Sequence, residues 1–513
     1  MYKPSGAVKR YLCCATRKPW RCGNSGCSER ARIDPAGARA LVLGRATLCG
    51  WHRGHAVPAW HHAGMNTDPS FANAQVMRAV REAAFANTMD VVCQRHPHYQ
   101  ALMRQQGLSR ADFKSLSDLA LLPLTHKADY MAAPEQFTLH TEGLPMEMQT
   151  MWDTMYTTGS TGGKPTPFVS TSFDFFNILA LQRNMLRLRG VHSQDVIANL
   201  FPLTPAPHGA WIRVLHAAAS MNVRVFCAMP GQASPYFELG HGLDEVVHLV
   251  QTQAATVLWG VPSYIYRVLS RAGELGLQLP NVRLVFVTGE AMGEQARTDM
   301  QQALLRVVAN NAQISISYGA TEFQGGLVEC APGAGFHNPL PAQLLIEVVD
   351  PQTHQPLPDG EPGWVVLTHL HRTGTVLLRY ALGDTSVRTQ QPCPHCGAIT
   401  DRLIQTPHRV DALLKIKGML VNPAVVVQAL DGMLGARAFQ VQVQATDPAH
   451  ALAGDVLQVW VEGAGDAALQ QALVERVKQV CGVTPQVVLG ADPRSWGADQ
   501  HWKRKKFVDL RAH

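Results

Sequence analysis

A loop rich in hydroxyls and glycines lies near residue 160 of the chain. The stretch YTTGSTGGKPTPF, residues 156–168, holds five serine or threonine hydroxyls, three glycines and one lysine. Hydroxyl donors, a free backbone and a cation are together suited to holding a phosphate chain. The Walker pattern does not fit, because Thr158 takes the place of its first glycine and Pro165 follows Lys164. We therefore predict a hydroxyl-rich nucleotide lid of another type, with a flexible glycine-rich linker as the alternative.

Four more motifs follow this loop along the chain. They are VTGEAM at 287–292, SYGATE at 317–322, RYALGD at 379–384 and HRVDALLKIKG at 408–418. As an ordered set with the loop they resemble the adenylate-forming superfamily, which contains acyl-CoA synthetases, peptide-synthetase adenylation domains and luciferases. The stretches WGVPSYIYRVL, KIKGMLVNPAVVV and EC…GFH resemble its phenylacetate–CoA ligase branch. The resemblance covers about Met65 to Arg511.

The resemblance implies a nucleotide site with a part for each motif. The expected nucleotide contacts are Thr157, Thr158, Gly159, Ser160, Thr161, Gly162, Lys164, Gly289, Glu290, Tyr318, Gly319, Asp384 and Arg409. Lys164 is expected to neutralise the outer phosphates. The loop has one glycine more than the usual motif of the branch, so the resemblance assigns this lysine to within one position in the sequence. Tyr318 is expected to stack on adenine, and Asp384 to accept hydrogen bonds from the ribose. Plainer alternatives are a core tyrosine, a surface acid at Glu290 and an ordinary turn at 383–384.

Thr321 and Glu322 are the expected catalytic pair of the SYGATE motif. The resemblance places the Thr321 hydroxyl near the α-phosphate and assigns the Glu322 carboxylate to Mg²⁺. Magnesium takes few protein ligands when substrate phosphates supply the rest, so one carboxylate is enough. The reaction also needs a second cation at the α-phosphate, and the resemblance assigns it to Lys503. Lys505 and Lys506 are close enough to take its place, and a solvated basic tail is the plainer alternative.

Residues 409–418 are expected to let the last domain change its position. Asp411 stands where the family has its hinge, and hinges are a few residues at the ends of elements that absorb the change in backbone angles. In one pose Lys503 is expected to reach the acyl phosphate. In the other pose the strand with Lys417 faces the site, and Gly418 leaves room for the pantetheine arm of coenzyme A.

Four metal-ligating side chains form a separate pattern. Cys393 and Cys396, followed by a glycine, are typical of half a zinc knuckle, and Cys330 and His337 lie upstream at a distance that allows a tetrahedral site. Members of the branch look similar here, some with bound zinc. We predict a structural Zn²⁺ without an open coordination position. His395 is a competing ligand, free thiols with a surface histidine are the alternative, and a disulfide does not suit a cytosolic enzyme.

Composition predicts a globular protein. Of the 513 residues 46% are hydrophobic, but no stretch approaches the ~20 apolar residues that a membrane helix needs. The net charge of +6 is unevenly distributed: residues 1–64 hold 11 lysines and arginines against two acids, which leaves 34 basic and 37 acidic residues in the remainder. The larger part therefore has no basic surface for nucleic acid, and we expect a cytoplasmic protein.

Residues 1–64 differ from the rest of the chain. They contain five of the eleven cysteines and three of the ten tryptophans without any sustained periodicity, and a capped helix pattern begins just after Met65. We expect them to be a non-native N-terminal extension, translated from a wrongly assigned start codon, or a disordered segment. A targeting segment and a Cys/His metal or nucleic-acid module are the alternatives.

The elements that must position these motifs predict an α/β protein. Residues 66–150 are mostly helical in pattern, and strands at 195–201, 222–228, 255–260, 282–289 and 314–319 alternate with helices such as 262–275 and 293–310. Such alternation predicts a mostly parallel, helix-flanked sheet with ligands at the carboxyl ends of its strands. Strands at 343–350, 363–370 and 375–383 predict a small antiparallel sheet or barrel. Helices near 423–431 and at 467–480, with strands at 439–446, 456–463 and 484–489, predict a small α+β domain.

These elements divide the chain into an extension at 1–64, a large adenylate-forming domain at 65–408 with a zinc knuckle at 330–396, and a mobile cap domain at 409–513. The expected activity is an acid–thiol ligase that uses ATP, Mg²⁺ and coenzyme A, carries structural Zn²⁺, and forms an acyl-AMP from an aryl or arylacetic acid. Transfer to a carrier protein, adenylation of a deazaflavin, and a non-enzymatic zinc- and nucleotide-binding protein are the alternatives. We expect no nucleic-acid or membrane partner; the identity of the acid and a homodimeric state are left open.

Overall fold

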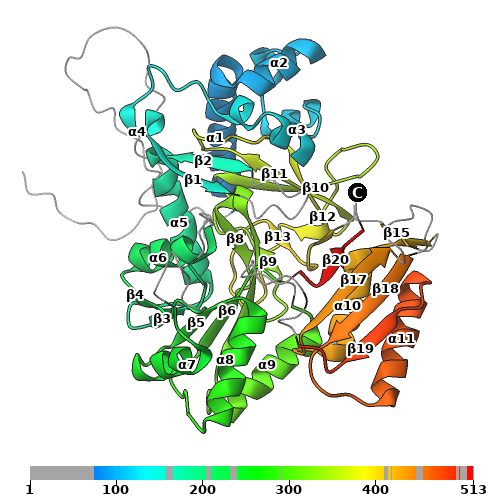
Figure 1. Cartoon of the computed structure of the whole chain (residues 1–513). Coiled ribbons are helices and arrows are strands. Elements are labelled where there is room, and N and C mark those ends of the chain that lie inside the picture. Colours follow the sequence, from blue (N-terminus) through cyan, green and yellow to red (C-terminus); the bar gives the residue numbers. More distant parts are fainter. Residues whose placement is uncertain are drawn as a thin grey trace, which may run out of the picture. The chain divides into compact units, whose positions relative to one another are not determined.

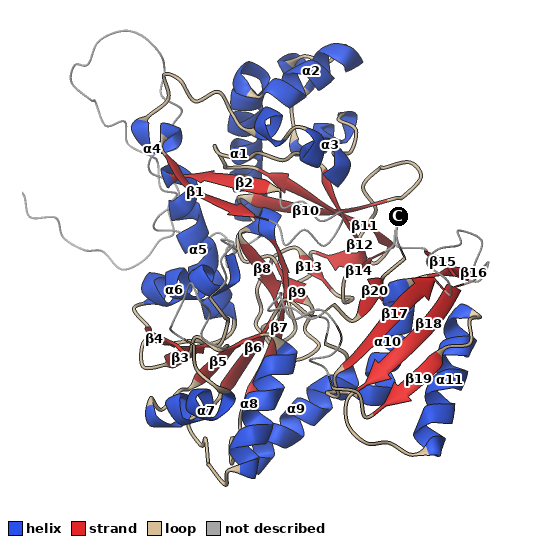
Figure 2. Cartoon of the chain, viewed as in Figure 1, coloured by secondary structure: helices blue, strands red, loops and turns tan. Residues whose placement is uncertain are grey.

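The computed structural model in Figures 1 and 2 describes residues 74–156, 166–203, 209–231, 240–290, 292–409, 414–416, 419–445, 455–492, 496 and 505–511. All of them belong to the unit Val57–His513. The segment 1–64, expected to be an extension or disordered, lies outside the described residues.

Helices come first in the described chain, in agreement with the pattern over 66–150. They are α1 (Ala74–Arg95), α2 (Pro97–Gln106), α3 (Lys127–Ala132) and α4 (Met146–Gln149), with the 3-10 turns η2 (Arg110–Asp112), η3 (Leu116–Leu121) and η4 (Pro134–Phe137). Helix α2 has Pro97 in its first turn, where a missing N–H costs nothing, and Gly107 ends it at φ 67°. Arg81 of α1 is buried and pairs with Asp401, which fastens the helix to a segment 320 residues away.

A hairpin and a parallel sheet follow. The hairpin consists of β1 (Met151–Tyr156) and β2 (Pro167–Thr171), and the parallel strands are β3 (Val196–Asn199), β4 (Arg224–Cys227), β5 (Val257–Gly260), β6 (Leu284–Val287) and β7 (Gln313–Ala320). The helices of this region are α5 (Ser172–Leu188), α6 (Gly209–Met221), α7 (Leu243–Thr252), α8 (Pro262–Glu274) and α9 (Glu294–Arg306). Strands β5 and β6 are buried at every position, as expected for parallel strands covered on both faces. The predicted helix-flanked parallel sheet is confirmed.

The antiparallel strands continue the same sheet (Figure 2). From β7 the order runs through β8 (Gly325–Val328), β9 (Phe336–His337), β13 (Arg402–Leu403), β12 (Tyr380–Thr389), β11 (Pro362–His369) and β10 (Leu344–Val349), and β14 (His408–Arg409) pairs with β12. The sequence predicts this part as a sheet or barrel of its own, whereas the structure joins it to the parallel half through β8, β9 and β13. Two of these strands have two residues each, too few for any period, and they pair across 65 residues of chain.

One predicted strand is displaced. The apolar pattern predicts a strand at 375–383, but β12 begins only at Tyr380. The backbone N–H groups of residues 376–379 bind acceptors outside any ladder: Phe137 O, His369 Nδ1, the Tyr99 hydroxyl and Thr368 Oγ1. Arg379 has φ 46°, which breaks the extended backbone. The apolar run is therefore buried without being a strand.

The residues after 413 have a hydrophobic core of their own. Strands β15 (Leu414–Ile416) and β16 (Met419–Val421) form a hairpin, and the sheet β19-β18-β17-β20 consists of β17 (Phe439–Ala445), β18 (Asp455–Val461), β19 (Gln486–Leu489) and β20 (Phe507–Asp509). Helices α10 (Pro423–Leu434) and α11 (Ala467–Cys481) share this core with the sheet. The predicted C-terminal α+β region is confirmed, while its boundary near residue 409 and its mobility stay predictions. Within the described ranges, no helix has the length and apolar character that crossing a membrane requires.

Candidate active site and metal centre

The hairpin β1–β2 carries the predicted phosphate loop. Thr157, Thr158, Gly159, Ser160, Thr161, Gly162 and Lys164 lie outside the described residues. The two strands beside the loop are described, and Tyr156 pairs with Pro167 where the loop leaves the hairpin. The Pro167 carbonyl accepts a hydrogen bond from the Tyr130 hydroxyl, and the Arg372 guanidinium lies 4.5 Å from the centre of the Phe168 ring. The stem of the predicted loop is therefore held by side chains from two other parts of the chain.

The SYGATE and RYALGD motifs meet through two tyrosine–carboxylate hydrogen bonds. Tyr318 lies on β7 and Glu322 in the 3-10 turn η5 (Thr321–Phe323), while Tyr380 and Asp384 lie on β12. The Tyr318 hydroxyl donates to Asp384 Oδ2 at 2.5 Å, and the Tyr380 hydroxyl donates to Glu322 Oε1 at 3.0 Å. Each motif thus supplies the tyrosine that orients the carboxylate of the other. The structure brings together the residues predicted for adenine, ribose and magnesium.

Glu322 is also held through its backbone. Its side chain is largely buried, with 8% of the residue exposed, and its carbonyl oxygen lies 3.0 Å from His369 Nε2. His369 Nδ1 accepts from the Leu377 N–H at 3.0 Å, so the ring proton lies on Nε2 and is donated to Glu322. Burial, followed by the charge of Arg372, lowers the pKa of His369 to about 3. The ring therefore stays neutral and remains a donor at physiological pH.

Sequence reasoning missed Tyr380 and His369. Tyr380 is the second residue of the RYALGD motif that also contains Asp384, so the motif itself carried the signal. No sequence signal points to His369, because its contact with Glu322 joins residues 47 positions apart through the tertiary structure.

Asp384 and Arg409 lie side by side in the β12–β14 ladder, where they are paired residues. Asp384 is 7% exposed, so its carboxylate is almost withdrawn from solvent. The Arg409 side chain lies outside the described part of the structure. Its backbone position beside Asp384 agrees with the predicted contact to ribose or phosphate, which stays a prediction.

The VTGEAM motif begins at the end of β6, and its residues stabilise the local structure there. Gly289 has φ 89°, a backbone conformation that glycine adopts without strain. Glu290 accepts hydrogen bonds from the backbone N–H of Ser263 at 3.2 Å and from its hydroxyl at 3.0 Å, which places a carboxylate at the N-terminus of α8. On the neighbouring β7, a Cβ at Gly319 would lie 3.1 Å from Thr288 Oγ1. The two motifs therefore approach each other closely at the carboxyl ends of their strands.

The residues predicted for the mobile domain are only partly described. Asp411, Lys417, Gly418 and Lys503 lie outside the described residues, and their roles stay predictions. Lys506, the alternative to Lys503, has its Nζ 2.5 Å from Asp431 Oδ1 and 5.1 Å from the centre of the Phe439 ring. Burial raises the pKa of Asp431, and Lys506 opposes that shift. Lys506 is thus engaged inside the C-terminal region.

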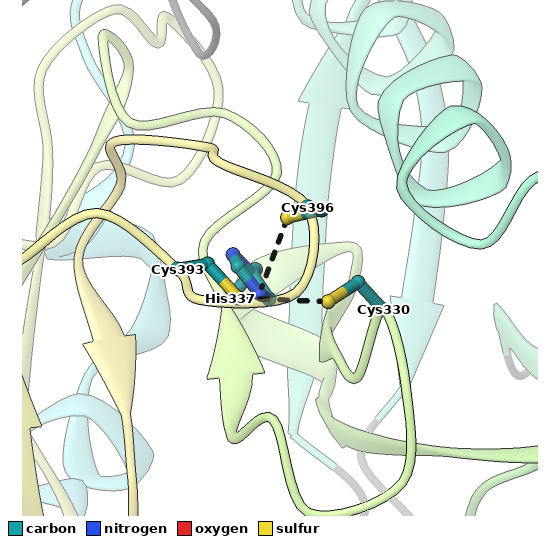
Figure 3. A group of neighbouring side chains, drawn as sticks. All are labelled: Cys330, His337, Cys393 and Cys396. Atoms are coloured by element: carbon teal, nitrogen blue, oxygen red, sulfur yellow. Dashed lines mark hydrogen bonds between the residues drawn. The ribbon is translucent and has the colours of Figure 1, made fainter.

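The four predicted metal ligands lie together (Figure 3). Their ligand atoms are all within 4.8 Å of one another. Cys330 Sγ lies 3.7 Å from Cys393 Sγ, and Cys396 Sγ lies 3.9 Å from His337 Nε2. A tetrahedral zinc with Zn–S bonds of about 2.3 Å has ligand atoms separated by about 3.8 Å. The cluster therefore has the dimensions of a four-coordinate zinc site, and its cysteines are not in disulfides.

The electrostatics of the cluster differ from ligand to ligand: burial, followed by the neighbouring cysteines, raises the pKa of Cys330, and burial raises the pKa of Cys396, whereas the pKa values of His337 and Cys393 are lowered. Burial, followed by Arg402 and His395, lowers the pKa of His337 to about 4, so its ring is neutral and able to ligate. Its other nitrogen, Nδ1, lies 3.3 Å from Thr400 Oγ1, the kind of outer contact that orients a ligand ring. Burial raises the pKa of Cys393, but hydrogen bonds from the backbone of Cys396 and His395 outweigh it and lower that pKa. His395 contributes its backbone to this set, and the ligand group contains His337 instead.

The fold and the paired motifs on β7 and β12 are those of an adenylate-forming enzyme. Residues 56–371 match the family model described as AMP-binding enzyme, and the chain belongs to this family. Among curated proteins it is similar to a phenylacetate-coenzyme A ligase of Thermus thermophilus, with 26% identity over 85% of this chain and 97% of the relative. A phenylacetate-coenzyme A ligase of Aromatoleum evansii is 24% identical over 65% of this chain and 70% of that protein.

Solved structures support the same fold. A 2-hydroxyisobutyryl-CoA ligase in the postadenylation state, in complex with 2-HIB-AMP, superposes with a TM-score of 0.68 and 20% identity, covering 86% of this chain and 91% of that one. The same enzyme with 2-HIB-AMP and CoA in the thioesterification state gives a TM-score of 0.58 over the same shares of both chains.

Proposed function

We propose that this enzyme is an ATP-dependent acid–coenzyme A ligase, and that its acid is an aryl or arylacetic acid. The carboxylate of the substrate attacks the α-phosphate of ATP, forming an acyl-AMP and releasing pyrophosphate. The thiol of coenzyme A then displaces AMP. The curated relatives named phenylacetate-coenzyme A ligase support the substrate class. The observation that carries the proposal is the pair of crossed tyrosine–carboxylate bonds, which orients the carboxylates of Glu322 and Asp384 between the β7 and β12 motifs.

Each predicted site residue has a role that suits its charge and shape. Asp384 accepts from the ribose, and the Tyr318 ring offers an apolar face to adenine. Glu322 is the predicted magnesium ligand, and its carboxylate oxygen suits that hard cation. When bound, magnesium neutralises charge on the phosphates of ATP. Thr321 adds a hydroxyl at the α-phosphate, and Lys503 supplies the second cation there.

Pyrophosphate exchange tests the adenylation step. The protein is incubated with ATP, labelled pyrophosphate and one acid from a panel that includes phenylacetate, benzoate and 2-hydroxyisobutyrate. We expect label to enter ATP only with an acid present, and most rapidly with an arylacetic acid. Coenzyme A consumption measured with the same acid distinguishes the ligase from transfer to a carrier protein or adenylation of a deazaflavin. Nucleotide binding without any exchange would instead support a non-enzymatic zinc- and nucleotide-binding protein.

We propose that the cluster of Cys330, His337, Cys393 and Cys396 holds a structural Zn²⁺. All four ligand positions are filled by side chains, which leaves none for substrate. Metal analysis of the purified protein is expected to give about one zinc per chain. Cys393→Ser should lose the metal and lower the melting temperature, because a hydroxyl is a poor zinc ligand. Cys93→Ser is the matched control, and zinc retained in Cys393→Ser would contradict the assignment.

Three further features belong to this proposal. We infer that the protein is cytoplasmic and that it can form a homodimer; both stay predictions from the sequence. The C-terminal region from about residue 409 is proposed to act as a mobile cap, and its separate hydrophobic core supports an independent unit.

A further inference from the structure

A buried arginine on α6 connects three elements around the candidate site. Arg213 is 5% exposed, and its Nη2 donates to Asp153 Oδ2 at 3.1 Å. The same Nη2 donates to the side-chain oxygen of Gln324, and Nη1 lies 2.9 Å from His216 Nδ1. Burial, followed by the charge of Arg213, lowers the pKa of His216 to about 4, so the neutral ring accepts from the guanidinium. Asp153 is therefore the carboxylate that compensates this buried charge.

Gln324 carries the connection into the turn with Thr321 and Glu322. Its Nε2 donates to the Thr321 carbonyl at 2.7 Å, while its Oε1 accepts from Arg213. Gln324 adopts φ 56°, a left-handed conformation that non-glycine residues rarely take. Glycine is the residue that adopts this conformation without strain. The glutamine therefore pays a conformational cost at a position where its side chain bridges two elements.

Asp153 ties the same arginine to the stem of the predicted phosphate loop. It lies on β1, which runs to Tyr156, the last residue before the loop. The β1–β2 register shifts between Met151 and Asp153, and a bulge of this kind re-aims the side chains next to it. The side chain of Asp153 is 16% exposed, so the pair with Arg213 is screened little by solvent.

We propose that Arg213 and Gln324 are positioning residues that fix the Thr321–Glu322 turn relative to the stem of the phosphate loop. Arg213 holds the stem through Asp153 and the turn through Gln324, so the groups that act on the α-phosphate and on the outer phosphates share one anchor. The inference rests on the proposed function, because the turn matters for chemistry only if this enzyme adenylates an acid. Neither residue belongs to the predicted nucleotide contacts; Gln324 acts through the Thr321 carbonyl, and Arg213 acts through Gln324 and Asp153.

The test uses variants that separate positioning from folding. Gln324→Gly removes the side chain, and relief of the left-handed strain offsets part of the stability lost with its two hydrogen bonds, so the variant should still fold with a measurable melting temperature. Its kcat for acid-dependent pyrophosphate exchange is expected to fall about 10- to 100-fold, because small misplacements of catalytic groups are costly. The KM for ATP should stay within about threefold, since the lost stabilisation belongs to the transition state.

Arg213→Met should show the same fall in kcat, and the double variant should be no slower than the slower single variant, because both changes break one connection. Arg283→Met is the matched control. It also leaves a buried aspartate, Asp195, without its arginine, but at the amino-terminal ends of the parallel strands. That variant should lose stability while its folded fraction keeps the kcat of the unchanged protein.

The outcomes distinguish this inference from the proposed function. If the unchanged protein shows no exchange with any acid, the proposed function is wrong. If the unchanged protein exchanges label but folded Gln324→Gly does so at the same kcat, the positioning role is wrong and the proposed function stands. Multiplicative effects in the double variant would likewise show two independent roles and overturn the shared anchor.

Discussion

Asp384 accepts a hydrogen bond from the Tyr318 hydroxyl. A carboxylate that is already oriented and nearly buried needs little rearrangement when a ribose arrives, and such preorganisation is what makes polar groups effective in sites withdrawn from water. The same holds for Glu322, which is oriented by the Tyr380 hydroxyl on one side and His369 on the other.

Replacing the charge of Asp384 tests its predicted role. Asp384→Asn should raise the KM for ATP in pyrophosphate exchange by about 10- to 100-fold, because hydrogen bonds to a charged group are worth about 1.5–3 kcal/mol. Asp359→Asn removes a partly exposed aspartate that pairs with Arg388, and it should leave this KM unchanged. An unaltered KM for ATP in Asp384→Asn would contradict the predicted role of Asp384 in ribose binding.

His96 makes stability depend on pH. It is fully buried, Nε2 lies 3.0 Å from the Val376 carbonyl, and burial lowers its pKa to about 3. Because the ordinary pKa is about 6.5, the unfolded chain binds the proton first, and stability present above pH 6.5 is lost as pH falls towards 3. Between pH 7.5 and 5.5 this histidine should remove about 1.4 kcal/mol of unfolding free energy. Urea titrations of His96→Gln should show a shallower pH dependence; an equally steep one would contradict the assignment.

At the scale of elements, apolar runs with clear ends were predictable and short non-local pairings were not. The five parallel strands and the two helices of the C-terminal region lie where the pattern predicts them, because burial on both faces of a strand leaves a continuous apolar run and burial of one helical face leaves a period in the sequence. Strands β9 and β13 leave no such trace, since each has two residues and its partner lies far along the chain. The run at 375–379 misleads because burial alone does not make a strand.

In the candidate site too, residues within sequence motifs were predictable, and contacts between distant parts of the chain were not. The positions of Tyr318, Glu322 and Asp384 were predictable from motifs, and so was the cluster of the four proposed metal ligands. Arg213 was not, because its partners Asp153 and Gln324 lie on other elements, 60 and 111 residues away in the chain, and meet it only after folding.

Gly374 tests how the loop before β12 is fixed. Asp174, fully buried at the start of α5, accepts the backbone N–H groups of Thr373 and Gly374, each at 2.8 Å. A Cβ at 374 would collide with the Val169 carbonyl oxygen and lie 2.8 Å from Asp174 Oδ2. Gly374→Ala should therefore lower the unfolding free energy by about 1–3 kcal/mol, measured by urea denaturation.

Gly273 provides the matched control for that change. It lies on α8, and a Cβ added there would meet nothing within 4 Å, so alanine should be neutral or stabilise by up to about 1 kcal/mol. If Gly374→Ala and Gly273→Ala changed the unfolding free energy equally, the predicted collision at Gly374 would not destabilise the protein.

At the scale of the whole molecule, the C-terminal region must deliver a lysine to the site if the proposed reaction is right. Lys503→Ala should abolish pyrophosphate exchange while coenzyme A still cleaves a supplied acyl-AMP. Lys506→Met should lower the melting temperature, because it leaves the buried Asp431 unpaired, and it should keep both half-reactions. Equal loss of both half-reactions in Lys503→Ala would count against its role, and selective loss of exchange in Lys506→Met would transfer that role to Lys506.

The pairing of β9 with β13 has a consequence for synthesis of the chain. The ladder that joins the parallel and antiparallel halves needs residues 402–403 beside residues 336–337, and the proposed metal ligands flank the same junction. The ribosome must therefore have released residue 403 before the central sheet can be completed, even though β3 to β7 are translated much earlier. Until then the growing polypeptide exposes the unpaired edge of β8 and β9, and a pause in translation after these strands have left the ribosome, but before residue 403 has done so, should favour aggregation there.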